Sequence, residues 1–311
     1  IGVAKDNPKM IEKYFPLVSQ VCPDYSHPLL FYYLGVIDYS YNRFEQAVVY
    51  FEKFLNATLN NNAYSKMQID AINYIEWCEF LALSEKDKYP FRPEKLENIS
   101  TNQDETKPYI SFDGNTALFV RKVKQRSKNE ESFYQQTSFI TKDVLCQAFL
   151  EFNEDLGIWE FDEGFPINEF ENVVNKPTKV SLTADNKQMY FSYLDKASGK
   201  YQIYCSHSVG GVWSKPENIG NIVNDATANL VDPFITADGN TLYFSSDKKG
   251  GQGGYDIWVT HKSKNSSWLK PTNLGKRINT PRNETSPYLH ADNNSFYFSS
   301  NGWKGFGDMD L

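Results

Sequence analysis

The sequence lacks a long apolar run. A helix that crosses a bilayer needs 18 or more consecutive apolar residues, and no apolar run in this sequence approaches that length. It also lacks an excess of basic residues. Asp and Glu number 39 against 32 Lys and Arg, which gives a formal net charge of −7. A surface of that sign repels phosphate backbones and anionic lipids. We therefore expect a chain that does not span a membrane and does not bind nucleic acid.

Cysteine is scarce and poorly spaced for metal binding. The four cysteines, Cys22, Cys78, Cys146 and Cys205, form no C-x-x-C pair, which argues against a zinc site. The simplest interpretation is four buried free thiols. A disulfide between Cys22 and Cys78 remains open as an alternative, and an oxidising compartment would favour it.

Motifs of catalysis are missing as well. No G-x-S-x-G nucleophile turn occurs, and the glycine run from Gly250 to Gly254 lacks the lysine of a phosphate-binding loop. Turn geometry explains that run. His207 and His261 occupy equivalent repeat positions, so we interpret them as structural. We expect no catalytic residue, no metal, no cofactor and no enzymatic activity.

Aromatic residues are plentiful, at 15 % of the chain, and they mark a repeat. The repeat begins with an aspartate-led tight turn between two β-prone runs, at Asp113, Asp185, Asp238 and Asp292. The last three turns are 53 and 54 residues apart, and such a fixed period is typical of repeat architectures. The run after each turn alternates and is rich in aromatics, for instance L-Y-F-S-S from Leu242.

A third strand follows in every copy, and a tryptophan ends each complete copy. The third strands start near Asp143, Gln202, Asp256 and Asp310, and the tryptophans are Trp159, Trp213 and Trp268. Four short strands with one aromatic anchor per repeat predict the blades of a β-propeller. The repeated aspartates at the third strands could ring a cation, but bonding to backbone amides of the preceding turn is the favoured interpretation.

The predicted organisation is therefore multidomain, α followed by all-β. Residues 1–88 form a helical domain, 89–94 a linker and 95–311 a propeller with blades near 105–165, 178–220, 231–275 and 285–311. Residues 124–142 are predicted to be an inserted surface loop in the first blade. Because the fourth copy stops at Leu311 as its third strand begins, we expect the propeller to be incomplete.

The first 88 residues show helical spacing of apolar side chains. Two helices are expected to begin at Pro8 and Pro28. Asn42 and Glu45 are expected to cap a third helix, and a fourth should run from about Tyr64 to Leu83. Leu34, Gly35, Phe44, Ala47 and Phe51 resemble a tetratricopeptide repeat, in which the small residues let two helices cross around Phe51. An unrelated helical bundle is the alternative.

Such helical repeats stack into a curved solenoid that binds partners on its concave face. In that register Tyr32 and Tyr39 would face the groove and contact a partner. The equally weighted alternative is that both tyrosines only pack within the domain.

The blade phrase P-x-x-[ST]-x-D-G-x-x-L-Y-F-S-S, followed by G-G-x-D-I and W-x-x-P-x-N-[LI]-G, resembles the TolB-type, WD40-like propeller repeat. With Glu105 to Pro108 and Glu284 to Pro287 as E-T-x-P and a helical repeat ahead, the chain resembles PorE-like, OmpA-family periplasmic proteins of Bacteroidota. Val180 and Gln202 depart from the phrase in the second copy. The resemblance implies six blades when complete and an OmpA-type peptidoglycan-binding domain that this sequence lacks.

This resemblance leads us to expect a non-enzymatic scaffold in the periplasm, associated with the outer membrane. Its partners would be outer-membrane or periplasmic proteins, with those of type IX secretion as the candidates, and peptidoglycan would be held through the missing domain. The alternative function is a propeller that binds a ligand such as a glycan, using aromatics such as Trp303 at the blade rim.

Overall fold

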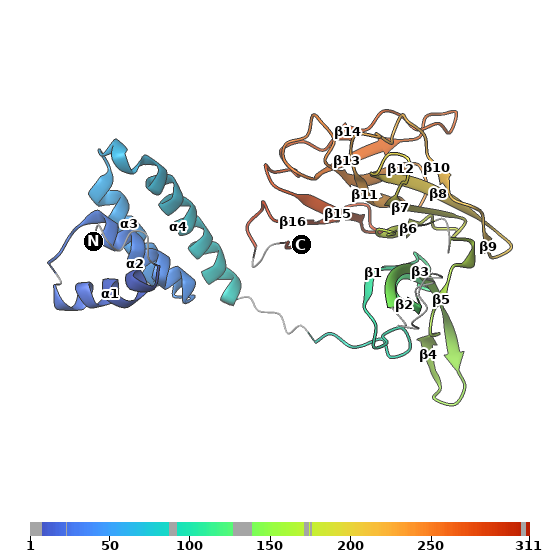
Figure 1. The fold of residues 1–311 in the computed structure, drawn as a ribbon, viewed down its shortest axis with the longest axis horizontal. Coiled ribbons are helices and arrows are strands. Elements are labelled where there is room, and N and C mark those ends of the chain that lie inside the picture. The colour runs from blue at the N-terminus through green and yellow to red at the C-terminus, as the bar shows by residue number, and fades with distance from the viewer. Residues whose placement is uncertain are drawn as a thin grey trace, which may run out of the picture. The chain divides into compact units, whose positions relative to one another are not determined.

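The computed structural model describes residues 8–22, 24–86, 92–126, 139–170, 174, 176–305 and 309–311. Internal contacts divide the chain between Arg92 and Pro93 into two units, one helical and one built of β-sheets (Figure 1). Among the described residues, no helix is long and apolar enough to cross a membrane. Each unit is considered by itself below.

The helical unit contains α1 (Pro8–Val21), α2 (Pro28–Ser40), α3 (Phe44–Thr58), the 3₁₀ turn η1 (Asn62–Tyr64) and α4 (Ser65–Lys86). α2 starts as expected at Pro28, where the His27 side chain accepts a hydrogen bond from the Leu29 N–H. The predicted capping pair of Asn42 and Glu45 is wrong. Asn42 adopts a left-handed conformation with φ of 59°, so Arg43 takes the N-cap position and makes no side-chain cap.

The crossing of α2 and α3 agrees with the sequence. Phe51 and Ala47 are fully buried, and a Cβ placed on Gly35 would lie only 2.8 Å from the Phe51 ring. Only glycine permits this approach, as the spacing of small residues predicted. The finer assignment to the tetratricopeptide family is not established by this packing and stays a prediction.

The β part comprises four sheets among the described residues, which we name blades 1 to 4. Blade 1 holds β1 (Glu105–Ile110), β2 (Thr116–Arg126), β3 (Phe139–Asn153), β4 (Ile158–Phe161) and β5 (Phe165–Pro166). After η2 (Asn168–Phe170), blade 2 holds β6 (Val180–Leu182), β7 (Gln188–Leu194), β8 (Tyr201–Val209), β9 (Val212–Trp213) and β10 (Glu217–Asn218). Blade 3 holds β11 (Leu230–Ile235), β12 (Thr241–Ser246), β13 (Asp256–His261) and β14 (Thr272–Asn273), and blade 4 holds β15 (Glu284–Leu289) and β16 (Phe296–Ser300).

Each blade is an antiparallel meander, and its first strand is its inner strand. The inner strands β1, β6, β11 and β15 follow one another side by side, β1 next to β6, β6 next to β11 and β11 next to β15 (Figure 1). This is the arrangement of blades around the axis of a β-propeller. The sequence prediction of propeller blades is confirmed at this level.

The predicted insertion in blade 1 has a different form. Residues 124–126 and 139–142 continue β2 and β3, with Arg126 paired to Phe139, so that the two strands make a long ribbon. The rest of the predicted loop, 127–138, lies outside the described residues. The pairing of β2 with β3 therefore extends into the segment predicted to be a loop.

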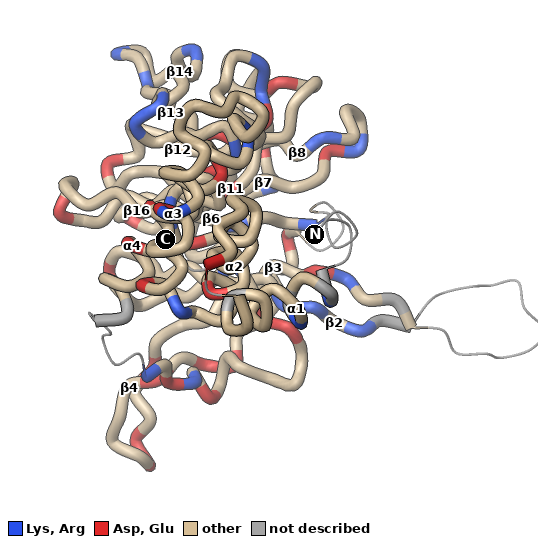
Figure 2. The backbone as a smooth tube through the Cα atoms, turned by 90° about the vertical axis from the view of Figure 1, so that its left-hand side faces the viewer, with Lys and Arg blue, Asp and Glu red and all other residues tan. Residues whose placement is uncertain are grey.

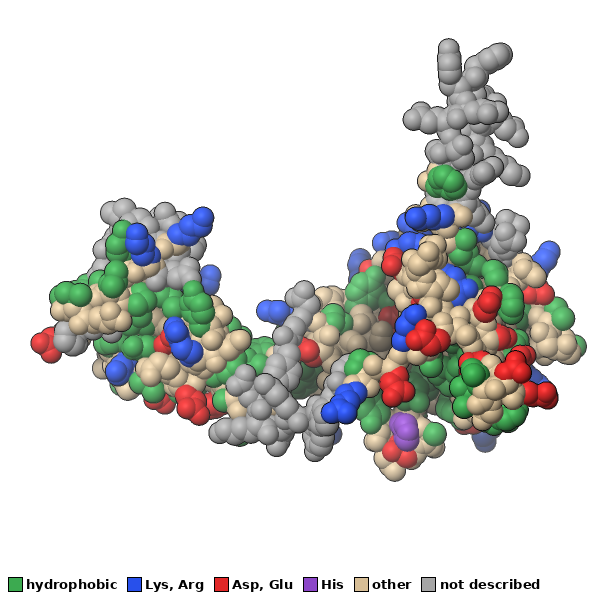
Figure 3. Space-filling model, turned by 90° about the horizontal axis from the view of Figure 1, so that it is seen from below, with side chains coloured by type: hydrophobic (Ala, Val, Ile, Leu, Met, Phe, Trp, Pro, Cys, Tyr) green, Lys and Arg blue, Asp and Glu red, His purple; other side chains and the backbone are tan. Residues whose placement is uncertain are grey.

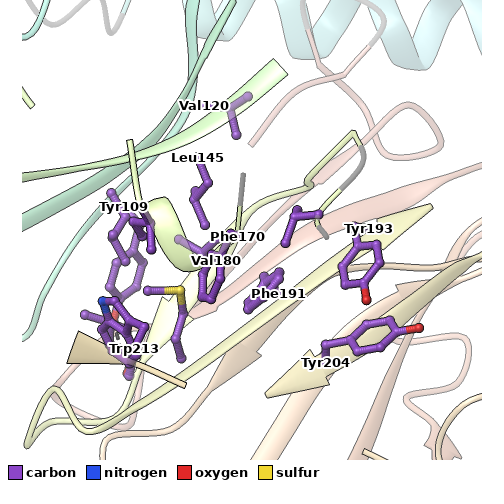
Figure 4. Close-up of a cluster of buried hydrophobic side chains, with 14 of the residues drawn as sticks. Tyr109, Val120, Leu145, Phe170, Val180, Phe191, Tyr193, Tyr204 and Trp213 are labelled. Atoms are coloured by element: carbon purple, nitrogen blue, oxygen red, sulfur yellow. Dashed lines mark hydrogen bonds between the residues drawn. The ribbon is translucent and has the colours of Figure 1, made fainter. Parts of the chain in front are cut away.

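Aromatic side chains fill the core between blades 1 and 2 (Figure 4). Tyr109 and Leu145 of blade 1 meet Phe191 and Trp213 of blade 2, and Tyr193 stacks on Tyr204 with ring centroids 4.1 Å apart. The Tyr109 hydroxyl donates to the Leu182 carbonyl at 3.2 Å, which links the two inner regions. Many of the aromatic side chains in the sequence therefore pack where neighbouring blades meet.

The cysteines are all free. Cys78, Cys146 and Cys205 are buried, as expected, but Cys22 is exposed and carries no disulfide to Cys78. The alternative of a Cys22–Cys78 disulfide is therefore wrong in this structure. Cys22 directly follows the last residue of α1, whereas Cys78 faces the core beside Phe44 and Phe54.

Candidate functional site

The predicted turn aspartates bind their own hairpins. In each hairpin, one carboxylate oxygen accepts a backbone N–H two residues further on, at 2.8–3.1 Å in Asp113, Asp185, Asp238 and Asp292. In the first three, a Ser or Thr hydroxyl also donates to the carboxylate. These donors hold the pKa of Asp113, Asp185 and Asp238 below the usual aspartate range. Their role in the fold is to close the turns.

The repeated tryptophans differ in their surroundings. Trp213 is 6 % exposed and donates from Nε1 to Gln147 of blade 1 at 3.0 Å, and Trp268 meets Tyr190 of blade 2 edge-on. Each therefore packs against the preceding blade. Trp159 is 65 % exposed, and its nearest ring is Phe152 of its own hairpin. No blade precedes blade 1 among the described residues, so this tryptophan has no such partner there.

Tyr32 and Tyr39 lie in the helical core. Tyr32 contacts the rings of Phe51 and Phe54, and Tyr39 contacts Phe44. Burial raises the pKa of Tyr32 to about 12 and that of Tyr39 above its ordinary value. Both side chains are half-buried, so packing accounts for most of their surface. Their predicted contact with a partner stays a prediction.

The aspartate that opens the third strand serves the turn before it. Asp256 is fully buried and accepts the backbone N–H groups of Gln252 and Gly253 and the side-chain amide of Asn273. In blade 2 its counterpart Gln202 instead donates to the carbonyls of Tyr201, Asp225 and Ala228. For Asp256 the backbone-amide interpretation is therefore confirmed, and a search of the described residues finds no group of acids, histidines or cysteines able to hold a metal ion.

A site that sequence reasoning missed lies on the inner strands, at the residue just before the first proline of the blade phrase (Pro108, Pro233 and Pro287) or, in blade 2, before Val180 in its place. These bulge positions are Lys107, Lys179, Asp232 and Ser286, one for each blade. In blades 1, 3 and 4 the pairing of the inner strand shifts at this residue, which makes it a β-bulge. Bulges are over-represented beside functional sites, because they turn side chains away from the sheet.

The backbone is unusual at these positions. Lys107, Asp232 and Ser286 have φ of 56°, 50° and 54°, although none is glycine and each precedes a proline. A bulky residue rarely adopts positive φ, and a following proline restricts it further. Repeated strain of this kind is a reason to look for function at the site. Lys179, which precedes Val180, keeps negative φ.

Hydrogen bonds join the bulge positions of neighbouring blades. The Asp232 carboxylate accepts the Lys179 backbone N–H at 3.4 Å and the Ser286 hydroxyl at 3.2 Å. It therefore links blades 2, 3 and 4. The Lys107 ammonium donates to the Pro177 carbonyl at 2.9 Å, which links blade 1 to the segment ahead of β6.

The Lys179 ammonium stands apart from this network. It lies 5.9 Å from the Tyr288 ring centroid, and no described residue accepts a hydrogen bond from it. Burial lowers the pKa of Lys179, and the Asp232 carboxylate opposes part of that effect. A half-buried cation with unused donors is suited to binding an anionic group.

A cysteine–histidine contact in the described part of blade 2 does not make a nucleophile. The Cys205 sulfur lies 3.9 Å from His207 Nε2, but burial raises the pKa of Cys205 to about 11. The thiol therefore stays protonated at neutral pH, whereas catalysis by cysteine needs the thiolate. Trp303, the rim aromatic considered for glycans, uses its indole N–H to bind the Ile278 carbonyl.

Comparison with known proteins gave structural neighbours only. No family model matches the chain, and no curated protein matches it. Among solved structures, a puromycin-hydrolysing peptidase of Mycobacterium tuberculosis matches over 56 % of this chain and 24 % of its own, with 12 % identity and a TM-score of 0.35. The propeller of the Trilobed protease from Pyrococcus furiosus matches over 63 % and 48 %, with 10 % identity and a TM-score of 0.35. A prolyl endopeptidase structure matches over 63 % and 25 %, with 16 % identity and the same TM-score.

These neighbours correct the functional prediction. They are peptidases and a protease propeller rather than periplasmic scaffold subunits, so the expectation of a scaffold linking an outer-membrane machine to the cell wall is contradicted and is not pursued. The prediction that the chain is not an enzyme stays a prediction. The chain spans a quarter to a half of their length, and likeness at this TM-score assigns no activity to it.

Proposed function

We propose that the β part is a peptide-recognition propeller that holds the terminal carboxylate of its ligand at the bulge positions. The observation that carries the proposal is the half-buried Lys179 ammonium, which has no acceptor among the described residues. A carboxylate placed against it would gain a charge-assisted hydrogen bond in a site already partly shielded from water.

The neighbouring groups favour a carboxylate over a phosphate. Asp232 lies close enough to influence the pKa of Lys179, and it would repel a dianion more strongly than a single charge. Asp232 can also accept an N–H from the ligand, because a carboxylate has more acceptor sites than its two present donors use. A peptide terminus offers both a single negative charge and a nearby N–H.

Binding should depend on pH through Lys179. Its folded-state pKa is lowered, so the ammonium is lost at a lower pH than for an ordinary lysine. Affinity for a carboxylate is therefore full below this lowered pKa and falls as the pH rises through it. A ligand without a carboxylate should show no such decrease.

The test compares fluorescein-labelled hexapeptide pools that end in a free carboxylate with the same pools ended by an amide. We expect about tenfold weaker binding of the amidated pools, and the same loss for Lys179→Met. The control Lys196→Met removes an exposed lysine of the β7–β8 connection and should bind as the parent does. Equal affinity for both pools, or no binding of either at about 1 mM, refutes the proposal.

The finer family and location are also proposals. The support for a PorE-like, periplasmic and outer-membrane-associated protein is the blade phrase with its E-T-x-P variant. Fractionation of the native source, with periplasmic and outer-membrane markers, checks the location. Recovery only with the cytoplasmic marker rejects it.

A further inference from the structure

The end of the β3–β4 hairpin in blade 1 forms an unusual surface, which we call the acidic hairpin and define as residues 149–165. Its strands pair Phe152 with Trp159 and Leu150 with Phe161. Asn153 orders the turn, because its side-chain oxygen accepts the N–H groups of Asp155 and Leu156 at 3.0 and 3.1 Å. The hairpin projects from the rest of blade 1 (Figure 1).

Hydrophobic side chains are exposed along the acidic hairpin. Six large ones lie open to solvent: Phe149, Phe152, Leu156, Ile158, Trp159 and Phe165. Phe152 and Trp159 form a ring pair with centroids 5.4 Å apart. Exposed apolar surface of this extent on one element marks an interaction site rather than a random distribution of surface residues.

The charge of this surface has one sign. Six carboxylates lie among the exposed rings: Glu151, Glu154, Asp155, Glu160, Asp162 and Glu163. The sequence has no Lys, Arg or His from Val144 to Asn175, and none of the six pairs with a cation among the described residues. Figure 2 shows Asp and Glu on the β4 hairpin and Lys and Arg along β2. Figure 3 looks onto the side from which the hairpin projects and shows acidic and hydrophobic side chains beside one another.

A cleft lies where the rings and carboxylates meet. It has a volume of about 250 Å³ and is lined by Phe152, Phe161, Glu151, Glu160 and Asp162, together with Asn98 and Asn153. Carboxylates around an aromatic wall fit the end of an arginine or lysine side chain, whose cation can lie on a ring while it donates to the acids. Blade 3 shows the same preference, because the Lys262 ammonium lies 5.0 Å from the ring centroid of Trp268, the counterpart of Trp159.

We propose that the acidic hairpin is a docking site for an arginine- and lysine-rich segment of a partner protein. Charge complementarity selects this occupant, since an acidic segment, a nucleic acid or an anionic membrane would be repelled. The exposed rings add stacking area for the guanidinium groups. This site is separate from the bulge positions, so its test is independent of the peptide-terminus proposal.

The test uses the full chain and a fluorescein-labelled dodecapeptide of alternating arginine and serine, with a glutamate–serine peptide as the comparison. We expect the arginine peptide alone to bind, and its affinity to fall steeply as salt rises from 50 to about 300 mM. Trp159→Ala should weaken binding about fivefold, and Trp159→Phe should restore most of it. The control Trp303→Ala removes an exposed tryptophan of blade 4 and should leave binding unchanged.

A charge variant completes the experiment. Glu151→Gln with Glu160→Gln and Asp162→Asn should lower affinity at least tenfold, whereas Glu45→Gln with Glu52→Gln and Glu79→Gln, on the helical unit, should not. Circular dichroism confirms that each variant is folded. Equal binding of the two peptides, no binding of either, or equal losses in the hairpin and control variants overturns the proposal. Light scattering that shows dimers dispersed by Trp159→Ala would also overturn it, because the occupant would then be a second copy of the chain.

Discussion

Asp256 and Gln202 occupy the same repeat position but make hydrogen bonds of opposite polarity, and exchanging them should be costly. Asp256 receives two backbone N–H groups and one side-chain amide, whereas the Gln202 amide donates to three backbone carbonyls. Both side chains are buried, with 0 % and 4 % exposure. A simple repeat model would treat glutamine and aspartate as interchangeable here, and the hydrogen bonds argue otherwise.

The magnitude follows from the groups left unpaired. In Asp256→Gln a single amide oxygen replaces a carboxylate that serves three donors, so one or two buried donors lose their acceptor. At about 1–3 kcal/mol for each, we expect a loss of about 2–4 kcal/mol in the free energy of unfolding. Gln202→Asp sets a carboxylate against three carbonyl oxygens, which should cost about 3 kcal/mol or more.

Urea denaturation followed by tryptophan fluorescence measures both losses as shifts of the midpoint at constant slope. The control is Asp155→Gln, which makes the same chemical change at an exposed turn and should alter stability by less than about 0.5 kcal/mol. If Asp256→Gln is no more destabilising than Asp155→Gln, the polarity argument is wrong. A neutral Gln202→Asp would refute it equally.

Three further outcomes follow from the packing and the titrating groups. Gly35→Ala should destabilise the helical unit by about 1–2 kcal/mol, because the new Cβ would meet the Phe51 ring; this loss already includes about 1 kcal/mol of gained helix propensity. In thermal melts followed by circular dichroism at 222 nm, the additional change Phe51→Leu should relieve most of the loss. The pKa of Asp185 is lowered in the folded state, so its carboxylate stabilises the fold fully above the unfolded-state pKa near 3.9, and this stabilisation is lost as the pH falls through the folded-state pKa. In Asp185→Asn the urea midpoint should therefore change less with pH between pH 5 and about pH 2. Of the four thiols only Cys22 should react quickly with a chromogenic disulfide reagent, since the other three are buried; a folded protein with no rapidly reacting thiol would contradict this.

Most of the fold of the β part could be predicted from the repeat in the sequence. Turn aspartates such as Asp238 and the alternating strands after them are local signals, so the repeated hairpins of the blades could be predicted from the sequence. The helix crossing at Gly35 was equally readable, because a small residue opposite Phe51 has one simple explanation. The predicted N-cap at Asn42 was wrong, because asparagine is common both at helix N-caps and at left-handed turn positions, and the sequence alone does not distinguish the two.

The bulge positions could not be found in this way. Lys107, Lys179, Asp232 and Ser286 differ in chemistry, so no repeated residue type marks them, and only the structure reveals the backbone shift at Lys107, Asp232 and Ser286. One signal was available: the blade proline is preceded by a polar residue in every copy that has it. Val180 departs from the blade phrase, and Lys179 before it keeps negative φ, unlike the three residues that precede a proline.

The acidic hairpin was hidden by the same regularity. Trp159 falls at the expected distance from Trp213, so its spacing suggested an equivalent buried anchor. Its environment depends on contacts outside its own repeat, and spacing carries no information about those. The absence of basic residues from Val144 to Asn175 was visible in the sequence and could have separated this copy from the others.

Every sheet of the β part is assembled from one contiguous stretch of chain, and this has a consequence for how the protein folds. Strand-to-strand pairing stays within a single blade, while neighbouring blades meet through side chains such as Tyr109 and Ser181 and through single backbone hydrogen bonds such as the one from the Ala184 N–H to the Ala237 carbonyl. Each blade can therefore form early as a local unit and dock onto its neighbour afterwards, as in other repeat proteins. Native-state hydrogen exchange should then reveal separate opening reactions with protection shared within a blade, so that damage to one repeat is largely contained there.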